Sequence, residues 1–134
     1  MRDITFRARR TDNGEWVEGN LVWIKKLNDE PYQCFIISHL AYMEYGEFDD
    51  TYQVLPETVG QYTGLTDKNG KRIFEGDIVC FHGELYNEIF YIVFADGCFR
   101  LGRKNGYSYT LQNLCSALEV IGNIHDNPEL LEVK

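Results

Sequence analysis

One cysteine and one histidine are spaced in a way that could support covalent catalysis. Cys80 and His82 lie two residues apart in an apolar run, and side chains two apart on a β-strand point to the same face. A cysteine nucleophile also needs a third group that orients the histidine base. The sequence marks no such group, so we predict no cysteine hydrolase and name no catalytic residue. The many acidic residues leave an unrecognised acid–base enzyme as an alternative.

Metal and nucleotide motifs are also incomplete. No pair of histidines has the H-x-x-x-H or H-E-x-x-H spacing of a zinc site. A phosphate-binding loop needs four residues between its glycines and then Lys followed by Ser or Thr. Here Gly64 and Gly70 enclose a longer segment, and Lys71 is followed by Arg72, so the hydroxyl that would bind magnesium is missing. We interpret this segment as a charged hairpin at Asn69-Gly70, and we predict no metal and no cofactor.

The four cysteines are interpreted as structural thiols. They form no C-x-x-C pair, which excludes the usual zinc-ribbon and thioredoxin motifs. Cys34 and Cys80 lie in apolar, strand-like runs, where a free thiol behaves as a small hydrophobic side chain. The first residues are charged and lack the apolar region of a signal peptide. We therefore expect reduced cysteines and a cytoplasmic location.

Acidic residues are concentrated in one stretch of the chain. The protein has 13 Lys and Arg, 21 Asp and Glu, and a net charge of −8, which argues against a uniformly basic nucleic-acid-binding protein. Residues 27–67 contain no Lys or Arg at all. We interpret this stretch as a solvated acidic face. The alternative is a surface for a basic partner, formed by Glu47, Asp49 and Asp50.

A second candidate surface combines basic and aromatic residues. Small β-barrels bind single-stranded nucleic acid by stacking bases on aromatic rings beside basic groups. The last third of the sequence offers such a patch, with Arg100, Arg103 and Lys104 beside Phe99, Tyr107 and Tyr109. Aromatic residues at strand spacing more often pack in a core or pair across strands. We therefore keep a nucleic-acid-binding module as an alternative.

A small β-rich fold must position these residues. The chain has 134 residues, 44% hydrophobic and 14% aromatic, which is enough for a single domain with its own core. It has no apolar run of about 18 residues, so we predict no membrane span. Tight turns are predicted at four dipeptides that accept a positive φ. They are Asn13-Gly14, Asn69-Gly70, Asp96-Gly97 and Asn105-Gly106.

Runs rich in Val, Ile, Phe, Tyr and Trp lie between the turns and predict strands. They cover residues 4–8, 16–17, 21–24, 32–37, 73–74, 78–81, 89–94, 98–101 and 118–124, with a further turn at Gly19-Asn20. Helical signals are weaker. Short helices are predicted at 38–44, at 110–118 with Thr110 as the N-cap, and from Pro128 onward.

The segment 71–81 is the most informative for the fold. The step Gly76-Asp77 precedes an apolar strand. Glycine adopts conformations that other residues avoid, and aspartate hydrogen-bonds to the nearby backbone. We therefore predict a mainly β fold with short helices, in which residues 71–124 form a small SH3-like barrel. Residues 1–63 would form β-hairpins packed on it and residues 125–134 a tail, all in a single domain; the alternative is an α+β fold.

Three motifs span both ends and the middle of the chain. They are I-T-F-R-A at 4–8, Q-Y-T-G-L-T-D-K-N-G-K-R-I-F-E-G-D-I-V at 61–79, and E-V-I-G-N-I-H-D-N-P-E-L-L at 119–131. In order and spacing they resemble the YopX family of phage and prophage proteins, with one departure at His125, where the family usually carries an aromatic residue. We interpret the following residues of these motifs as structural: Gly64, Asn69, Gly70, Glu75, Gly76, Asp77, Gly122 and Asn123.

The resemblance implies a phage or prophage protein that acts in the cytoplasm of a bacterial host. It implies no established reaction, cofactor or catalytic residue. Our leading hypothesis is a non-catalytic accessory protein that binds an unknown host or phage macromolecule. The alternatives are a nucleic-acid-binding module on a small β-barrel and a structural or self-assembling phage protein. The aromatic content is compatible with a homo-oligomer.

Overall fold

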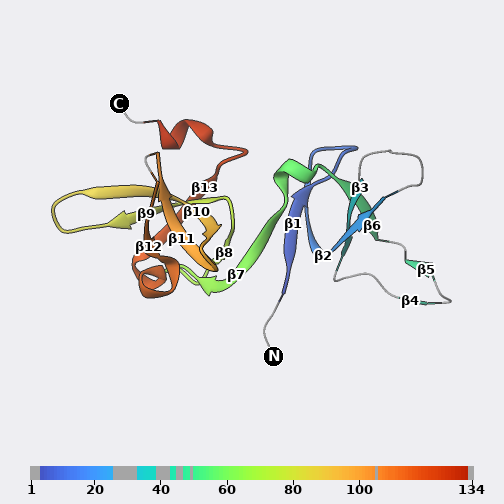
Figure 1. The fold of residues 1–134 in the computed structure, drawn as a ribbon, viewed down its shortest axis with the longest axis horizontal. Helices are drawn as coiled ribbons and strands as arrows, with labels where there is room; N and C mark the ends of the chain where they lie inside the picture. The colour runs from blue at the N-terminus through green and yellow to red at the C-terminus, as the bar shows by residue number, and fades with distance from the viewer. Residues whose placement is uncertain are drawn as a thin grey trace. The chain divides into compact units, whose positions relative to one another are not determined.

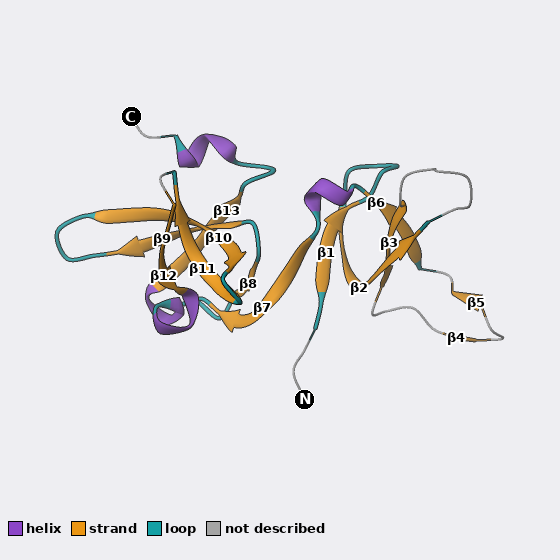
Figure 2. Cartoon of the chain, in the orientation of Figure 1, coloured by secondary structure: helices purple, strands orange, loops and turns teal. Residues whose placement is uncertain are grey.

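The protein consists mainly of β-strands, as the sequence predicts (Figure 2). The computed structural model describes residues 4–25, 33–38, 43–44, 47–48, 50–104 and 106–132. Within these ranges the strands are joined by loops and short 3₁₀ helices, and there is no α-helix. None of the described helices is long and apolar enough to cross a membrane. The mainly β prediction is therefore confirmed over the α+β alternative.

The chain folds as two compact units, Met1–Gln61 and Tyr62–Lys134. The first, unit 1, contains an antiparallel sheet with strand order β6-β3-β2-β1-β7 (Figure 1). Its strands are β1 (Phe6–Arg9), β2 (Trp16–Ile24), β3 (Gln33–Ser38), β6 (Thr51–Val54) and the start of β7 (Gly60–Thr66). The ladder of β4 (Met43–Glu44) with β5 (Glu47–Phe48) and the 3₁₀ helix η1 (Pro56–Thr58) also belong to this unit.

The sheet of unit 1 curls so that the end of β6 meets the end of β1. The N–H of Thr11 donates to the carbonyl oxygen of Gln53 at 3.0 Å. The N–H of Leu55 donates to the carbonyl oxygen of Arg9 at 2.9 Å. Alternate residues of the curled strands face inward, and they form a small core of Ala8, Cys34, Ile36 and Val54.

The predicted turn at Gly19-Asn20 is wrong, because both residues lie inside β2. Gly19 pairs with Ser38 on β3. A Cβ at Gly19 would lie 2.0 Å from the carbonyl oxygen of Ile37. Glycine is therefore required here because it lets two strand backbones approach closely, and it does not reverse the chain.

Unit 2 contains a five-stranded antiparallel sheet with order β12-β11-β10-β9-β13. Its strands are β9 (Asp77–His82), β10 (Asn87–Ala95), β11 (Cys98–Arg103), β12 (Gly106–Thr110) and β13 (Leu118–Asn123). The end of β7 pairs with β8 (Arg72–Phe74). This sheet covers the region predicted to be barrel-like. No ladder joins β12 to β13 in the described part of the chain, so hydrogen bonds do not close it into a barrel.

One face of this sheet carries the core of unit 2. On β10, Phe90 and Ile92 point to this face, and Ile92 lies opposite Leu101 on β11. The full set of buried residues is Ile73, Val79, Phe90, Ile92, Leu101, Leu111 and Leu118. Burial of each such side chain contributes about 1.5–3 kcal/mol of hydrophobic free energy. The core therefore holds the strands that line the cavity described below.

Three of the four predicted Gly turns are confirmed. Asp96 and Gly97 both have a positive φ, 53° and 81°, as a two-residue turn between β10 and β11 requires. Gly70, with φ of 81°, lies between β7 and β8, and Gly14, with φ of 73°, lies between β1 and β2. The fourth turn includes Asn105, which lies outside the described residues.

The predicted helices are shorter than expected. Residues 110–118 form two 3₁₀ turns, η2 (Leu111–Asn113) and η3 (Cys115–Ala117), and Thr110 makes no side-chain capping bond. The last helix, η4 (Pro128–Leu131), begins at the proline as predicted. In the segment 38–44, Ser38 ends β3 and residues 43–44 form β4, whereas the residues between them are not described. Short apolar segments fit either structure, and strand pairing decides between them.

Candidate functional site

A cavity of about 340 Å³ lies in unit 2, and we call it the aromatic cavity. Its walls are Phe81, Glu88, Phe90, Tyr109, Thr110, Asn113 and Leu114, contributed by β9, β10, β12 and the 3₁₀ turn after β12. Three of these side chains are aromatic, and a single one is an acid. Its size falls in the usual range of small-ligand pockets, roughly 300–1,000 Å³. It is therefore a candidate site in unit 2 for binding part of another molecule.

Strand register brings the walls together. Phe81 on β9 lies directly opposite Glu88 on β10. Phe90 follows two residues later, so it points to the same face as Glu88. Phe90 is 2% exposed and belongs to the core, whereas Tyr109 on β12 is 55% exposed. The cavity thus has a rigid floor in the core and a rim that solvent reaches.

An arginine of the protein itself occupies the edge of this site. The Arg103 guanidinium forms an ion pair with the Glu88 carboxylate. The guanidinium carbon lies 4.7 Å from the centre of the Phe90 ring, a cation–π contact. Both partners of Arg103 are walls of the aromatic cavity. Two walls of the cavity thus already contact a guanidinium group of the chain itself.

The predicted basic patch is only partly available to a ligand. The Nε–H of Arg100 donates to the carbonyl oxygen of Ala95 at 3.1 Å, and Arg103 contacts Glu88 and Phe90. Lys104 is exposed. Arg103 and Lys104 also border a second, wider groove of about 970 Å³, whose other walls come from β10, β11 and the segment 128–132.

The structure places an acidic side chain, Glu119, beside His82 and opposite Cys80. His82 Nε2 hydrogen-bonds with Glu119 Oε2 at 2.8 Å, and Glu119 lies opposite Cys80 in the β9–β13 ladder. The Cys80 thiol, however, contacts the carbonyl oxygen of Phe81 at 3.9 Å. Burial raises the pKa of Cys80, and the charge of the Glu119 carboxylate raises it further. The charge of Lys68 lowers it, but the net effect is a raised pKa. This environment stabilises the thiol over the nucleophilic thiolate.

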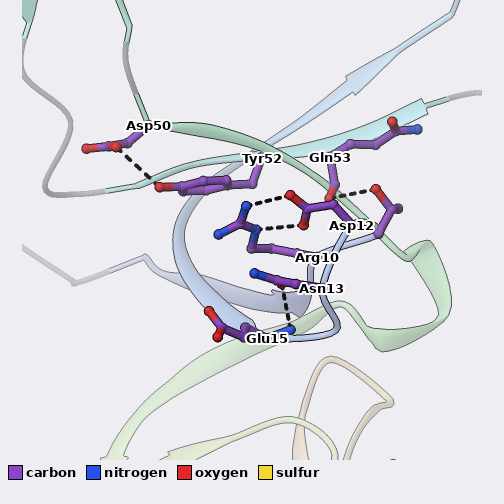
Figure 3. A network of polar contacts seen from close by, with 8 residues as sticks. Arg10, Asp12, Asn13, Glu15, Asp50, Tyr52 and Gln53 are labelled. Carbon is purple, nitrogen blue, oxygen red and sulfur yellow. Dashed lines mark hydrogen bonds and ion pairs between the residues drawn. The ribbon is translucent and has the colours of Figure 1, made fainter.

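Unit 1 contains a polar network around Arg10 (Figure 3). The guanidinium donates to both oxygens of Asp12, at 2.9 and 2.6 Å, and it lies 4.2 Å from the centre of the Tyr52 ring. The Tyr52 hydroxyl donates to Asp50 at 3.2 Å. Hydrogen bonding with Asp12 raises the pKa of Arg10, and the same bond lowers the pKa of Asp12. The charge of Asp50 raises the pKa of Tyr52.

The structure describes two of the three residues of the predicted acidic surface. Asp50 belongs to the Arg10 network, in which its carboxylate faces Tyr52 (Figure 3). Glu47 lies on β5, and Asp49 lies outside the described residues. The acidic surface therefore stays a prediction. Among the described residues, no group of three or more His, Cys, Asp or Glu side chains could hold a metal ion.

The Gly-Asp step makes backbone and side-chain hydrogen bonds within unit 2. Gly76 has φ of +90°, and its N–H donates to the carbonyl oxygen of Ile92 at 2.8 Å. Its own carbonyl accepts from the N–H of Ile124 at 2.9 Å. The buried Asp77 carboxylate accepts from the N–H of Phe74 at 2.7 Å and so closes the turn that contains Glu75. Backbone hydrogen bonds therefore join this turn to β10 and to the segment that follows β13.

The motif at 122–128 forms a compact turn after β13. The Asn123 side-chain oxygen accepts from the N–H groups of His125 and Asp126, at 3.0 and 2.8 Å. The Asn127 side chain packs against Gly122, where an added Cβ would lie 2.6 Å from its oxygen. Asn123 and Gly122 thus hold the chain in place before η4. Gly64, with φ of +84°, lies within β7.

Sequence patterns did not identify Phe81, Glu88 and Asn113 as site residues. No motif marks them, because they meet only through the register of β9 with β10 and the path of the chain after β12. The sequence suggests Tyr109 as part of a basic and aromatic patch, but its position as a cavity wall follows from the fold alone.

Comparison with family models and solved structures identifies proteins that are similar to this chain. Residues 5–132 match the family model described as "YopX protein". The chain belongs to the YopX family. Two solved structures are similar to this YopX-family chain over nearly its whole length. Protein EF1440 from Enterococcus faecalis is 28% identical, with a TM-score of 0.59, and the match covers 98% of this chain and 100% of that one.

The second structure is protein yopX from Bacillus subtilis. It is 19% identical with a TM-score of 0.54, and the match covers 97% of both chains. At this identity the likeness supports the YopX-family fold alone. The comparison with curated proteins found no significant match. Neither of these two proteins is identified by a reaction or a ligand.

Proposed function

We propose that this YopX-family protein acts by binding another macromolecule and not by catalysis. We place it as an accessory protein of a phage or prophage in the bacterial cytoplasm, as the family resemblance implies. The partner in this proposal is a protein of the host or of the phage. Burial raises the pKa of Cys80, which argues against a cysteine nucleophile at this position.

The observation that carries the proposal is the aromatic cavity. Its walls combine exposed and buried aromatic side chains, which supply much contact area at a low cost in side-chain entropy. Its acid, Glu88, is already paired with Arg103. A side chain of a partner that entered the cavity would be anchored there, and such buried anchors carry most of the free energy of an interface.

Two tyrosines on β12 allow a matched test. Tyr109 and Tyr107 are each 55% exposed, but of the two only Tyr109 lines the aromatic cavity. We expect Tyr109→Ala to reduce capture of the partner from nuclease-treated host extract by roughly tenfold or more. Tyr107→Ala should leave capture unchanged. Equal capture by both variants and the unmodified protein would contradict the use of this cavity.

The acidic surface supplies a separate arm of the same assay. If Glu47, Asp49 and Asp50 attract a basic partner, their neutral amide variants should weaken capture and reduce its dependence on salt. Capture that keeps the same affinity and salt dependence in the triple variant would reject the acidic surface and leave the cavity in place.

A nucleic-acid-binding function is the second candidate. The exposed Lys104 and the neighbouring Arg103 at the wide groove favour it. It predicts a salt-dependent gel shift with single-stranded DNA or RNA that weakens in Lys104→Gln. No shift at low salt, or an equal shift with this variant, would exclude the patch. Partners that disappear from the capture assay after nuclease treatment would favour this candidate over a protein partner.

A further inference from the structure

We propose that the aromatic cavity binds the side chain of an exposed arginine on a partner protein. This inference rests on the proposed binding function and names the group that is bound. It is carried by three observations on the described residues: the chemistry of the cavity walls, the contacts of Arg103, and the net charge of the chain.

The walls have the composition of a site for a cation. Phe81, Phe90 and Tyr109 present aromatic rings, whose faces attract positive charge. Glu88 adds a carboxylate between two of them, since it lies opposite Phe81 and two residues before Phe90. A planar guanidinium can stack on a ring and donate to a carboxylate at the same time, whereas a compact ammonium group stacks less well.

Arg103 shows that these walls accept a guanidinium. It pairs with Glu88 and lies 4.7 Å from the centre of the Phe90 ring, and both residues are cavity walls. Its side chain is about half exposed, so water can replace its contacts at low cost. Arg103 therefore acts as an internal competitor. A partner arginine that enters the cavity takes over the Glu88 carboxylate, and Arg103 turns toward solvent.

Net charge favours the same partner. The chain carries −8, so a basic partner surface is attracted at long range while an acidic one is repelled. The cavity then selects among basic residues by shape and by the pairing with Glu88. Affinity should fall as salt is raised, because ions screen the long-range part of the attraction.

The first test compares two small probes on the whole protein. Nα-acetyl-arginine methylamide carries the guanidinium, and Nα-acetyl-citrulline methylamide replaces it with a neutral urea of nearly the same shape. Binding is followed by the NMR signals of Phe90, Glu88 and Tyr109. We expect the arginine probe to shift them at a concentration at least about tenfold lower than the citrulline probe requires. The reason is that hydrogen bonds between charged groups are stronger than those of a neutral urea. Equal affinity of the two probes would overturn the proposal.

The second test uses two arginines of β11 that differ in their contacts. Arg103→Gln removes the internal competitor. We expect the affinity for the arginine probe to rise about threefold or more, because the probe no longer has to break an exposed ion pair to reach Glu88. Arg100→Gln changes the net charge equally, but Arg100 contacts the carbonyl of Ala95 and not Glu88. It should raise the affinity less than Arg103→Gln does, because only the change of net charge then acts. Weaker binding, or no change, in Arg103→Gln would contradict the competitor role.

A third variant separates failure of this inference from failure of the proposed function. Glu88→Gln should weaken the arginine probe about tenfold or more and leave the citrulline probe unaffected. If Tyr109→Ala abolishes capture of the partner while Glu88→Gln leaves both probes unchanged, the cavity binds an uncharged group and the arginine assignment is wrong. If Tyr109→Ala leaves capture intact, the cavity itself is not the binding site. Circular dichroism confirms that each variant is folded.

Discussion

The Asp67 carboxylate accepts a hydrogen bond from the N–H of Val120, 53 residues further along the chain, at 2.9 Å. Its other oxygen accepts from the N–H groups of Asn69 and Lys71, both at 2.9 Å. Asp67 is only 5% exposed. One side chain therefore closes the turn between β7 and β8 and joins it to β13.

Replacement of this carboxylate should destabilise unit 2. In Asp67→Asn the amide can present only one oxygen, so at least one buried N–H loses its acceptor or faces an NH₂ group. We expect a loss of about 1–3 kcal/mol in the free energy of unfolding, measured with urea. Asp96→Asn is the matched control, because Asp96 is exposed and its positive φ suits asparagine. Equal stability of the two variants would contradict this role of Asp67.

The same contacts predict a dependence of stability on pH. Burial alone would raise the pKa of Asp67, but hydrogen bonds from Val120, Lys71 and Asn69 outweigh it, so the pKa is lowered. Ionised Asp67 therefore stabilises the fold above the carboxyl pKa of the unfolded chain. This contribution is lost as the pH falls through the lower pKa of the folded state.

The corresponding measurement is urea unfolding at several pH values. Between about pH 6 and about pH 3, the unmodified protein should lose more unfolding free energy than Asp67→Asn, which has no carboxyl to protonate. Parallel curves for the two proteins would show that Asp67 does not titrate in this range.

Gly76 should tolerate few other residues. Its φ of +90° is disfavoured for residues with a Cβ, although the nearest atoms to an added Cβ are 3.8 Å away. The cost is therefore backbone strain and not a clash. We expect Gly76→Val to lower the unfolding free energy by roughly 1–3 kcal/mol, and Gly76→Asn to cost less because asparagine accepts positive φ more readily. An unchanged melting temperature in Gly76→Val would contradict this explanation.

Gly19 should be sensitive for a different reason. A Cβ at this position would meet the carbonyl oxygen of Ile37 at 2.0 Å, and a strand backbone cannot move aside without breaking its ladder. Gly19→Ala should therefore cost unit 1 about 3 kcal/mol or more. The neighbouring Asn20→Ala, at an exposed position of the same strand, should stay within about 0.5 kcal/mol. Thermal unfolding followed by circular dichroism distinguishes the two.

Local backbone features were predictable from the residues. Asp96-Gly97 and Gly76-Asp77 appear where positive φ and a backbone-bonding carboxylate are needed, because these preferences belong to the residues themselves. Gly19-Asn20 shows the limit of such reasoning. A glycine that permits close strand approach has the same local signal as one in a turn, and only its partner strand distinguishes the two.

The candidate site was less predictable than the fold. Arg103 and Tyr109 belong to the basic and aromatic patch that the sequence suggests, but the residues that complete the cavity carry no motif. Glu88 meets Phe81 because of the register of one hairpin, and it meets Arg103 because β11 lies beside β10. A shift of one residue in either ladder would turn these side chains to the opposite face.

Sequence alone thus determined the β-rich class, three of the glycine turns, the family and the net charge, since each depends on residue type and spacing along the chain. The tertiary structure decided that Asp67 bonds with Val120, that Arg103 pairs with Glu88, and that three aromatic rings surround one cavity. The physical reason is that such contacts join residues far apart in sequence. Their geometry is set by strand register and sheet curvature, and these follow from packing of the whole core and not from any local preference.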